Sequence, residues 1–396
     1  MKGNKISHKL RLIQAIINKI EYGSILATLH DGSPIEAHGA IPGPVGHIHI
    51  HNPQFFQRLL RDGDLGFGEM FMDGWWSTPN LEDLLDVIMM NNDTIAKGFP
   101  GGGLFRLKQK IMHLLNANSR KGSQRNIAYH YDLGNDFYRL WLDETLTYSS
   151  AFFKHEQESL AEAQRNKYAA ICDRILLKPD DSVLEIGCGW GGFAEFAAME
   201  RGIKVTGLTI SREQQEFAQR RVFEAGLAER VDIQLRDYRD ERGVYDGVAS
   251  IEMIEAVGEK YWPTYFRTLY NSLRPEGVAA VQAITISDRL FPSYRRSVDF
   301  MQKHIFPGGI LPCKSVMLKQ ARGANLETMD QREFGESYSH TLRRWRQRFN
   351  ERWNEISELG FDERFNRMWN YYLASSAASF KTQAIDVVQV SYRRQT

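Results

Sequence analysis

The sequence predicts an α/β protein with a doubly wound sheet, preceded by a small α+β domain at the N-terminus. Three observations lead to this prediction. The chain of 396 residues is longer than one simple core usually needs. Between residues 127 and 285, short apolar stretches alternate with helical patterns, as in βαβ units. One apolar stretch ends in a glycine-rich turn, Gly187-Cys-Gly-Trp-Gly-Gly192, that leads directly into a helical pattern.

Residues 1–92 are predicted to form the small α+β domain. Its expected elements are strands at 25–30 and 47–51 and helices at 55–60 and 81–90. Asn80 is a suitable N-cap for the second helix. Between the helices, the aromatic segment 66–76 ends in Trp75 and Trp76. These rings can meet a lipid surface, but packing in the core is the more common use of such side chains.

Residues 93–126 are predicted to be a basic linker. Pro100-Gly-Gly-Gly103 interrupts regular structure, and the stretch 119–125 is polar and basic. Residues 104–117 alternate apolar and basic side chains at helical spacing, as in helices that lie on an anionic membrane. Docking onto the rest of the protein explains the same pattern equally well.

Residues 127–396 are predicted to contain the doubly wound, Rossmann-like sheet. Parallel strands are expected near 182–186, 203–208, 231–235, 246–251 and 277–282. Ligands of such sheets bind at the carboxyl ends of the strands. An insertion at about 285–315 is predicted to form a lid, and residues 341–380 are predicted to form aromatic-rich C-terminal helices.

The glycine-rich turn indicates a site for a nucleotide-like cofactor. Glycines let the backbone approach a ligand closely, and the following helix start offers free N–H groups. Gly187, Gly189 and Gly192 also satisfy the dinucleotide fingerprint, which requires an acidic residue at the tip of the next strand. That tip, Thr209-Ile-Ser211, has no carboxylate. Glu185, before the turn, is typical of S-adenosylmethionine methyltransferases, so the loop favours methyl transfer over hydride transfer.

Composition and charge narrow the function further. A net charge of +1 gives no global reason to expect nucleic acid as a partner. Cys172, Cys188 and Cys313 lie far apart, which argues against a disulfide framework or a metal site of the zinc type. The N-terminus lacks a signal-peptide pattern, and no run of about 18 apolar residues occurs. We therefore expect a cytoplasmic protein without a membrane span.

Six motifs together resemble the cyclopropane-fatty-acid synthases and their mycolic-acid methyltransferase relatives. They are Tyr131-Asp-Leu-Gly-Asn135, Tyr148-Ser-Ser-Ala151, Leu184-Glu-Ile-Gly-Cys-Gly-Trp-Gly-Gly192, Gly207-Leu-Thr-Ile-Ser211, Ile251-Glu-Met-Ile-Glu-Ala-Val-Gly258 and Ile305-Phe-Pro-Gly-Gly309. Through Asp64-Leu-Gly-Phe-Gly-Glu69 and Met72-Asp-Gly-Trp-Trp76, the first domain also resembles that of the phospholipid-acting members. The resemblance covers nearly the whole chain in order.

The resemblance implies an enzyme that uses S-adenosyl-L-methionine to methylate double bonds of unsaturated acyl chains in membrane phospholipids, giving a cyclopropane fatty acid. Such an enzyme would bind the phospholipid bilayer surface and would be peripherally associated with the inner face of the membrane. The relatives also suggest a homodimer. Two alternatives from other classes are a non-catalytic protein that binds lipid and S-adenosylmethionine, and a methyltransferase of small molecules.

The resemblance also implies which residues contact the cofactor. They are Tyr148 and Ser149 at its methionyl end, Glu185, Gly187, Gly189 and Gly191 at the turn, Thr209 and Gln214 at the ribose in place of the missing acidic residue, and Asp237 and Tyr238 beside the adenine. Tyr131 would border the sulfonium and the acyl chain.

A bound bicarbonate is implied as the base that removes a proton after methyl transfer. In the family it is held by glutamate, histidine and tyrosine side chains and by backbone near a cysteine. Glu255 and Tyr338 match the glutamate and the tyrosine. The cysteine is Ser150 here, and the histidine is Gln282, two residues before Ile284, which we include in the catalytic set.

The two departures put ring closure in question, because an amide donates hydrogen bonds but does not titrate near pH 7. If the proton leaves the transferred methyl group, the ring closes. If it leaves a neighbouring chain carbon, the product is methyl-branched and still unsaturated. The sequence leaves both outcomes open.

Overall fold

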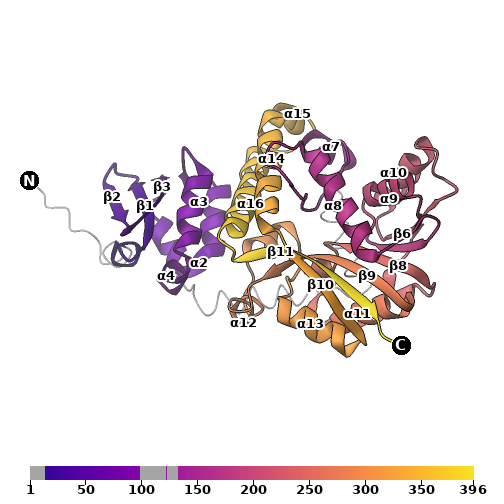
Figure 1. Cartoon of the computed structure of the whole chain (residues 1–396). Coiled ribbons are helices and arrows are strands. Elements are labelled where there is room, and N and C mark those ends of the chain that lie inside the picture. The colour runs from indigo at the N-terminus through magenta and orange to yellow at the C-terminus, as the bar shows by residue number, and fades with distance from the viewer. Residues whose placement is uncertain (1–13, 99–121, 123–132) are drawn as a thin grey trace, which may run out of the picture. The chain divides into compact units, whose positions relative to one another are not determined.

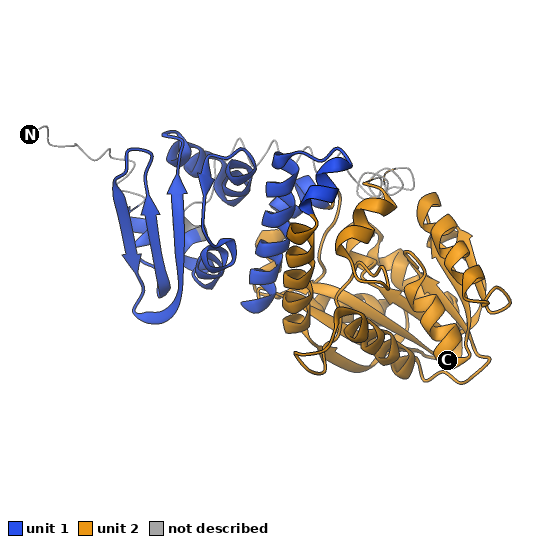
Figure 2. Ribbon diagram, turned by 90° about the horizontal axis from the view of Figure 1, so that it is seen from above, with its two compact units in different colours: residues 1–115, 296–305, 353–383 blue, residues 116–295, 306–352, 384–396 orange. Residues whose placement is uncertain are grey.

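The computed structural model describes residues 14–98, 122 and 133–396, which fall into two compact units (Figure 2). Unit 1 is drawn from Met1–Leu115, Arg296–Ile305 and Trp353–Gln383, and unit 2 from Asn116–Arg295, Phe306–Arg352 and Ala384–Thr396. Two segments after residue 127, Arg296–Ile305 and Trp353–Gln383, are grouped with the N-terminal residues. The expected linker helix at 104–117 and Tyr131 lie outside the described residues.

Unit 1 contains a four-stranded sheet in the order β2-β1-β3-β4 (Figure 1). The strands are β1 (Tyr22–Thr28), β2 (Pro34–His38), β3 (Ile41–Ile50) and β4 (Trp76–Ser77). Its helices are α2 (Phe55–Met72), α3 (Leu81–Met90), α4 (Asn92–Gly98), the π-helical turn η4 (Met301–Ile305), α15 (Trp353–Glu358) and α16 (Glu363–Lys381). Alternate side chains of β1 and β2 are buried, as expected for strands with one face on the core.

In unit 1, the expected N-cap and the expected packing of a tryptophan in the core are confirmed, and one helix is longer than expected. Helix α3 begins after Asn80, whose side chain accepts hydrogen bonds from the backbone N–H groups of Glu82 and Asp83. Helix α2 is longer than expected and takes up much of segment 66–76. Trp76 is fully buried, stacks on Phe67 and donates a hydrogen bond to its carbonyl oxygen. This tryptophan therefore packs in the core of the small unit.

Unit 2 contains a seven-stranded mixed sheet in the order β10-β11-β9-β8-β5-β6-β7. The strands are β5 (Ser182–Ile186), β6 (Lys204–Thr209), β7 (Val231–Leu235), β8 (Tyr245–Ile251), β9 (Leu273–Ile286), β10 (Leu326–Glu333) and β11 (Ile385–Arg394). The five expected strands are present and parallel. The sheet is not parallel throughout, because β11 pairs antiparallel with both β9 and β10.

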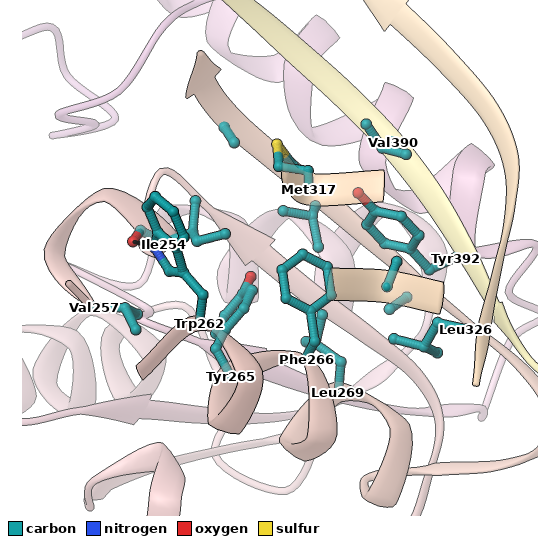
Figure 3. Packing of buried hydrophobic residues seen from close by; sticks show 14 of the residues in the cluster. Ile254, Val257, Trp262, Tyr265, Phe266, Leu269, Met317, Leu326, Val390 and Tyr392 are labelled. Atoms are coloured by element: carbon teal, nitrogen blue, oxygen red, sulfur yellow. Dashed lines mark hydrogen bonds between the residues drawn. The ribbon is translucent and has the colours of Figure 1, made fainter. Parts of the chain in front are cut away.

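Helices of unit 2 pack on both faces of this sheet, which confirms the doubly wound fold. They are α7 (Asn135–Trp141), α8 (Leu160–Ile175), α9 (Gly192–Arg201), α10 (Arg212–Glu224), α11 (Trp262–Asn271), α12 (Phe291–Tyr294), α13 (Lys314–Gly323) and α14 (Gly335–Glu351). One buried cluster joins α8, α9 and α10 to the sheet, and another joins α11 and α13 to it. Figure 3 shows Trp262, Tyr265, Phe266 and Leu269 of α11 beside Leu326 of β10 and Tyr392 of β11.

Within the described residues, no helix has both the length and the apolar character needed to cross a membrane.

Candidate active site

The glycine-rich turn joins β5 to α9 at the carboxyl edge of the sheet. Gly187 has a φ of 85°, and a Cβ built there would lie 2.9 Å from Cγ of Met253, so a side chain at this position would be both strained and crowded. Trp190 in the turn donates a hydrogen bond to Oδ1 of Asn135, 2.7 Å away, at the start of α7. The turn predicted from the sequence is therefore present, and it contacts another of the predicted motifs.

Glu185 lies two residues before Gly187, the first residue of this turn, and is buried. Burial raises the pKa of its carboxyl group to about 8, and Lys167 acts in the opposite direction. Among the described residues, its Oε2 atom has no hydrogen-bond partner. A buried acceptor without a partner at a sheet edge suits a ligand that carries hydrogen-bond donors. This observation fits the expected cofactor.

Two more expected cofactor residues lie together at the end of the neighbouring strand. Thr209 is the last residue of β6, and its hydroxyl donates a hydrogen bond to Oε1 of Gln214, 2.9 Å away, in the first turn of α10. Both residues are buried. Because β5 and β6 are parallel, this pair shares the sheet edge with the glycine turn.

Asp237 and Tyr238 follow β7 at the same edge. The carboxylate of Asp237 accepts hydrogen bonds from the backbone N–H and from Nε of Arg239, at 2.9 and 2.8 Å. The ring of Tyr238 lies 6.0 Å from that of Tyr265, and burial raises the pKa of the Tyr238 hydroxyl. The two residues thus lie at the sheet edge that carries the glycine turn, with the Asp237 carboxylate bound to Arg239; their position beside the adenine stays a prediction.

Tyr148 belongs to an aromatic cluster. Its ring lies 5.3 Å from that of Trp345 and 5.4 Å from that of Trp141, measured between centroids. Trp345 in turn lies 5.9 Å from Tyr338, at an interplanar angle of 88°. A continuous row of rings therefore connects Tyr148, expected beside the cofactor, with Tyr338, expected in the catalytic set.

Ser149 contacts a buried lysine that the sequence analysis did not single out. Lys167 of α8 is fully buried, and its Nζ donates a hydrogen bond to Oγ of Ser149, 2.7 Å away. Burial lowers the pKa of this ammonium group to about 7, although nearby carboxylates, led by Glu252, favour its charged form. Helical spacing could have indicated that this lysine is buried, because Lys167 shares the buried face of α8 with Ala163 and Ile171.

Glu252 lies among the groups expected to hold bicarbonate. Its Oε1 accepts hydrogen bonds from the backbone N–H of Ser150 and from Nε2 of Gln282, both at 2.8 Å. Its Oε2 accepts one from the hydroxyl of Tyr338 at 3.0 Å. Glu252 stands in the motif Ile251–Gly258, but its role was not predicted from the sequence. The feature that could have indicated a role is the presence of a second carboxylate three residues before Glu255.

Glu255 occupies a neighbouring position with a different set of contacts. Its Oε1 accepts a hydrogen bond from the backbone N–H of Ile284 at 2.5 Å, while its buried Oε2 has no partner among the described residues. Burial, and then the charge of Glu252, raise the pKa of Glu255 to about 8. The backbone carbonyl of Glu255 also accepts a hydrogen bond from the N–H of Ile310, within the expected lid.

Three groups expected to donate to bicarbonate and the backbone N–H of Ile284, from the same catalytic set, therefore each contact a glutamate. Ser150, Gln282 and Tyr338 donate to Glu252, and Ile284 donates to Glu255. In the described part of the chain, no group of three or more His, Cys, Asp or Glu residues is placed to hold a metal ion.

Comparisons with known proteins show the family to which the chain is similar. Residues 118–390 match the family model of mycolic acid cyclopropane synthetase. The chain is 39% identical over 373 residues to tuberculostearic acid methyltransferase of Mycobacterium tuberculosis, covering 89% of this chain and 84% of that protein. It is 37% identical over 348 residues to cyclopropane-fatty-acyl-phospholipid synthase of Escherichia coli strain K12, covering 88% and 87%.

A solved structure is also similar. A mycolic acid cyclopropane synthase complexed with S-adenosylhomocysteine and CTAB matches with a TM-score of 0.64 at 27% identity, over 68% of this chain and 98% of that one.

Proposed function

Because the chain belongs to the mycolic acid cyclopropane synthetase family, we propose that it methylates the double bond of an unsaturated acyl chain in a membrane phospholipid. Membership makes it an S-adenosylmethionine-dependent fatty-acyl C-methyltransferase. The choice of phospholipid as substrate is supported by the Escherichia coli relative, which is named for that substrate and whose match covers 87% of its length. We further propose peripheral association with the inner face of the membrane. The homodimer stays a prediction.

One observation supports this function above the others: cofactor residues and catalytic residues are adjacent in the chain and in space. Ser149, expected at the cofactor, is followed by Ser150, whose N–H contacts Glu252. Glu185, with its unpartnered oxygen, is one of the carboxylates that act on Lys167, and Lys167 contacts Ser149. A methyl donor in the glycine turn would therefore lie next to groups that can accept a proton.

In the proposed reaction, the double bond donates its electron pair to the sulfonium methyl carbon. The methyl–sulfur bond breaks, and positive charge moves onto the acyl chain. The row of rings formed by Tyr148, Trp345 and Tyr338 can stabilise that charge, because aromatic faces attract cations. A base must then remove one proton to give a neutral product.

Bicarbonate does not fit the donor groups as the structure presents them. The hydrogen bonds of Ser150, Gln282 and Tyr338 already go to Glu252.

The proposed product is a cyclopropane fatty acid, and a methyl-branched unsaturated chain is the second candidate. The comparisons support both, because one relative is named a cyclopropane synthase and the other a methyltransferase. The two products differ in which carbon loses the proton.

An isotope experiment tests the function and separates the two products. The purified protein is incubated with methyl-deuterated S-adenosylmethionine and vesicles of monounsaturated phospholipid, and the released fatty acids are analysed by mass spectrometry. We expect two deuterium atoms in the product, because ring closure removes one from the transferred methyl group. Three retained deuterium atoms would indicate the methyl-branched product. Absence of label from every lipid fraction would contradict the proposed function.

A further inference from the structure

The carboxylate of Glu252 is held as a bound anion would be. Oε1 accepts two hydrogen bonds, from Ser150 and Gln282, whereas Oε2 accepts one, from Tyr338. A carboxylate oxygen has two lone pairs, so Oε1 is saturated and Oε2 keeps one acceptor position. The three donors come from three separate segments of the chain and converge on one side chain.

The backbone at Glu252 is also unusual. Its φ of 49° lies in the left-handed region, which residues other than glycine rarely adopt. The conformation is held by a hydrogen bond from the Glu252 N–H to the carbonyl oxygen of Gln282, at 2.8 Å. Such outliers persist only where the surroundings fix them, and they cluster at active sites. Here the strain places the carboxylate among its donors.

Gln282 is oriented to donate to this carboxylate. Its Oε1 accepts a hydrogen bond from Nε2 of Gln389 in β11, at 3.0 Å, which directs its own Nε2 toward Glu252. Both glutamines are fully buried. This contact explains why Gln282 stands where the family has a histidine. A carboxylate partner requires a hydrogen-bond donor at this position, and the donor need not titrate.

The electrostatic surroundings suit a base. Burial raises the pKa of Glu252 and thereby increases its proton affinity, whereas its three donors and the cation of Lys167 act in the opposite direction by favouring the carboxylate. The neighbouring Glu255 has no such set of donors, and its pKa of about 8 keeps it mostly protonated at neutral pH. Of the two carboxylates, Glu252 is the one suited to accept a proton.

We propose that Glu252 is the general base of this enzyme and takes the place of bicarbonate. The inference rests on the proposed function and deepens it. After methyl transfer, a C–H bond of the transferred methyl group breaks, and its electron pair forms the second carbon–carbon bond of the ring. The proton goes to Oε2 of Glu252, which later releases it to solvent.

The first test compares two variants that replace a carboxylate by an amide of equal size. Glu252→Gln should lower kcat by about 100-fold or more, since general bases contribute about 10²–10⁴-fold, while the affinity for S-adenosylmethionine changes less than about threefold. Glu158→Gln is the matched control. Glu158 accepts hydrogen bonds from the N–H groups of Lys154 and His155 and from Asn166, and it lies outside the site. Its activity should be unchanged.

The second test uses the unmodified enzyme. Its activity should be the same in buffer purged of carbon dioxide as in buffer with added bicarbonate. ¹³C-bicarbonate should show no line broadening with the unmodified protein in an NMR titration. In Glu252→Ala the three donors lose their partner, so this variant should bind ¹³C-bicarbonate and regain at least about tenfold in activity when bicarbonate is added.

Three outcomes would overturn the inference: a bicarbonate requirement of the unmodified enzyme, bicarbonate binding by it that Glu252→Ala abolishes, or full activity of Glu252→Gln. If the unmodified enzyme transfers no methyl group to lipid, the proposed function fails instead. The NMR titration then still shows whether Glu252 excludes bicarbonate, because it does not depend on turnover.

Discussion

Two glutamates, one in each unit, show how partners decide the charge of a buried carboxylate. In unit 1, Glu69 accepts hydrogen bonds from Arg58, Lys303 and His304. Burial alone would raise its pKa, but His304 and Lys303 lower it to about 2. In unit 2, Glu255 has one N–H donor, from Ile284, and burial together with the charge of Glu252 raises its pKa to about 8.

The comparison distinguishes a carboxylate that stabilises the structure from one whose pKa is typical of a catalytic site. Glu69 is permanently ionised at neutral pH, so it serves to hold cationic side chains of the small unit together. Glu255 titrates close to neutral pH, and beside it Glu252 has three donors and a nearby cation. Groups with pKa values displaced in this way are typical of catalytic sites. Three predictions test whether this difference between the units is real.

The largest effect is expected from removing the charge of Glu69. Glu69→Gln removes the carboxylate that binds Lys303 and one of those that bind Arg58, which still contacts Asp62 and Asp73. Breaking the buried pair with Lys303 should reduce the free energy of unfolding by roughly 3 kcal/mol. Glu255→Gln should cost less than about 1 kcal/mol, because its carboxyl group is already mostly neutral. Urea unfolding of both variants at pH 7 measures the difference. Equal losses would contradict the comparison.

The pH dependence of stability should differ in sign between the two residues. Glu69 has a folded pKa of about 2, below its ordinary 4.5, so it stabilises the fold above pH 4.5 and this contribution is lost as the pH falls toward 2. Glu255 has a folded pKa of about 8, so its contribution is present below pH 4.5 and is lost as the pH rises through 8.

The same two variants check this sign. Unfolding free energies are measured across pH and compared with those of the unmodified protein. Glu69→Gln should flatten the profile below pH 4.5, and Glu255→Gln should flatten it between pH 4.5 and 8. A profile that flattens in the same range for both variants would show that the two carboxylates do not differ.

The smallest effect concerns Lys167, the cation near the unit 2 carboxylates. Lys167→Met removes a charge that lowers the pKa of Glu252, so the acidic limb of the kcat profile should move to higher pH. Among the described residues, the titratable groups that act on Glu252 or are acted on by it include Tyr338, Glu255 and Lys167, and the first two are left in place. A limb that stays in place or moves to lower pH would exclude this role for Lys167.

Local patterns predicted much of the fold. The Asn80 cap, the glycine turn and the five parallel strands follow from residue spacing, because each depends on neighbours in the chain. Strand β10, Leu-Glu-Thr-Met-Asp-Gln-Arg-Glu, is largely exposed and has no apolar alternation, so its sequence does not resemble a strand. It forms because β11 pairs with it.

The candidate site was predicted only in part. Ser150, Gln282 and Tyr338 were identified through motifs, but their common partner was not. The position of Glu252 depends on a left-handed backbone and on donors that are distant in the chain. Ser150 precedes it by 102 residues, and Gln282 and Tyr338 follow it by 30 and 86. The spacing of residues in the sequence does not indicate that these distant donors meet at one carboxylate.

The last strand of unit 2 has a consequence for the order in which the protein is assembled during translation. Strand β11 lies between β9 and β10 but is synthesised after both. The parallel strands β5 to β9 can therefore pair while the chain is still emerging from the ribosome, whereas β10 must wait for its neighbour. Gln389 of β11 also orients Gln282 toward Glu252. The nascent enzyme can thus complete its proton-accepting site only after residues 385–394 have left the exit tunnel.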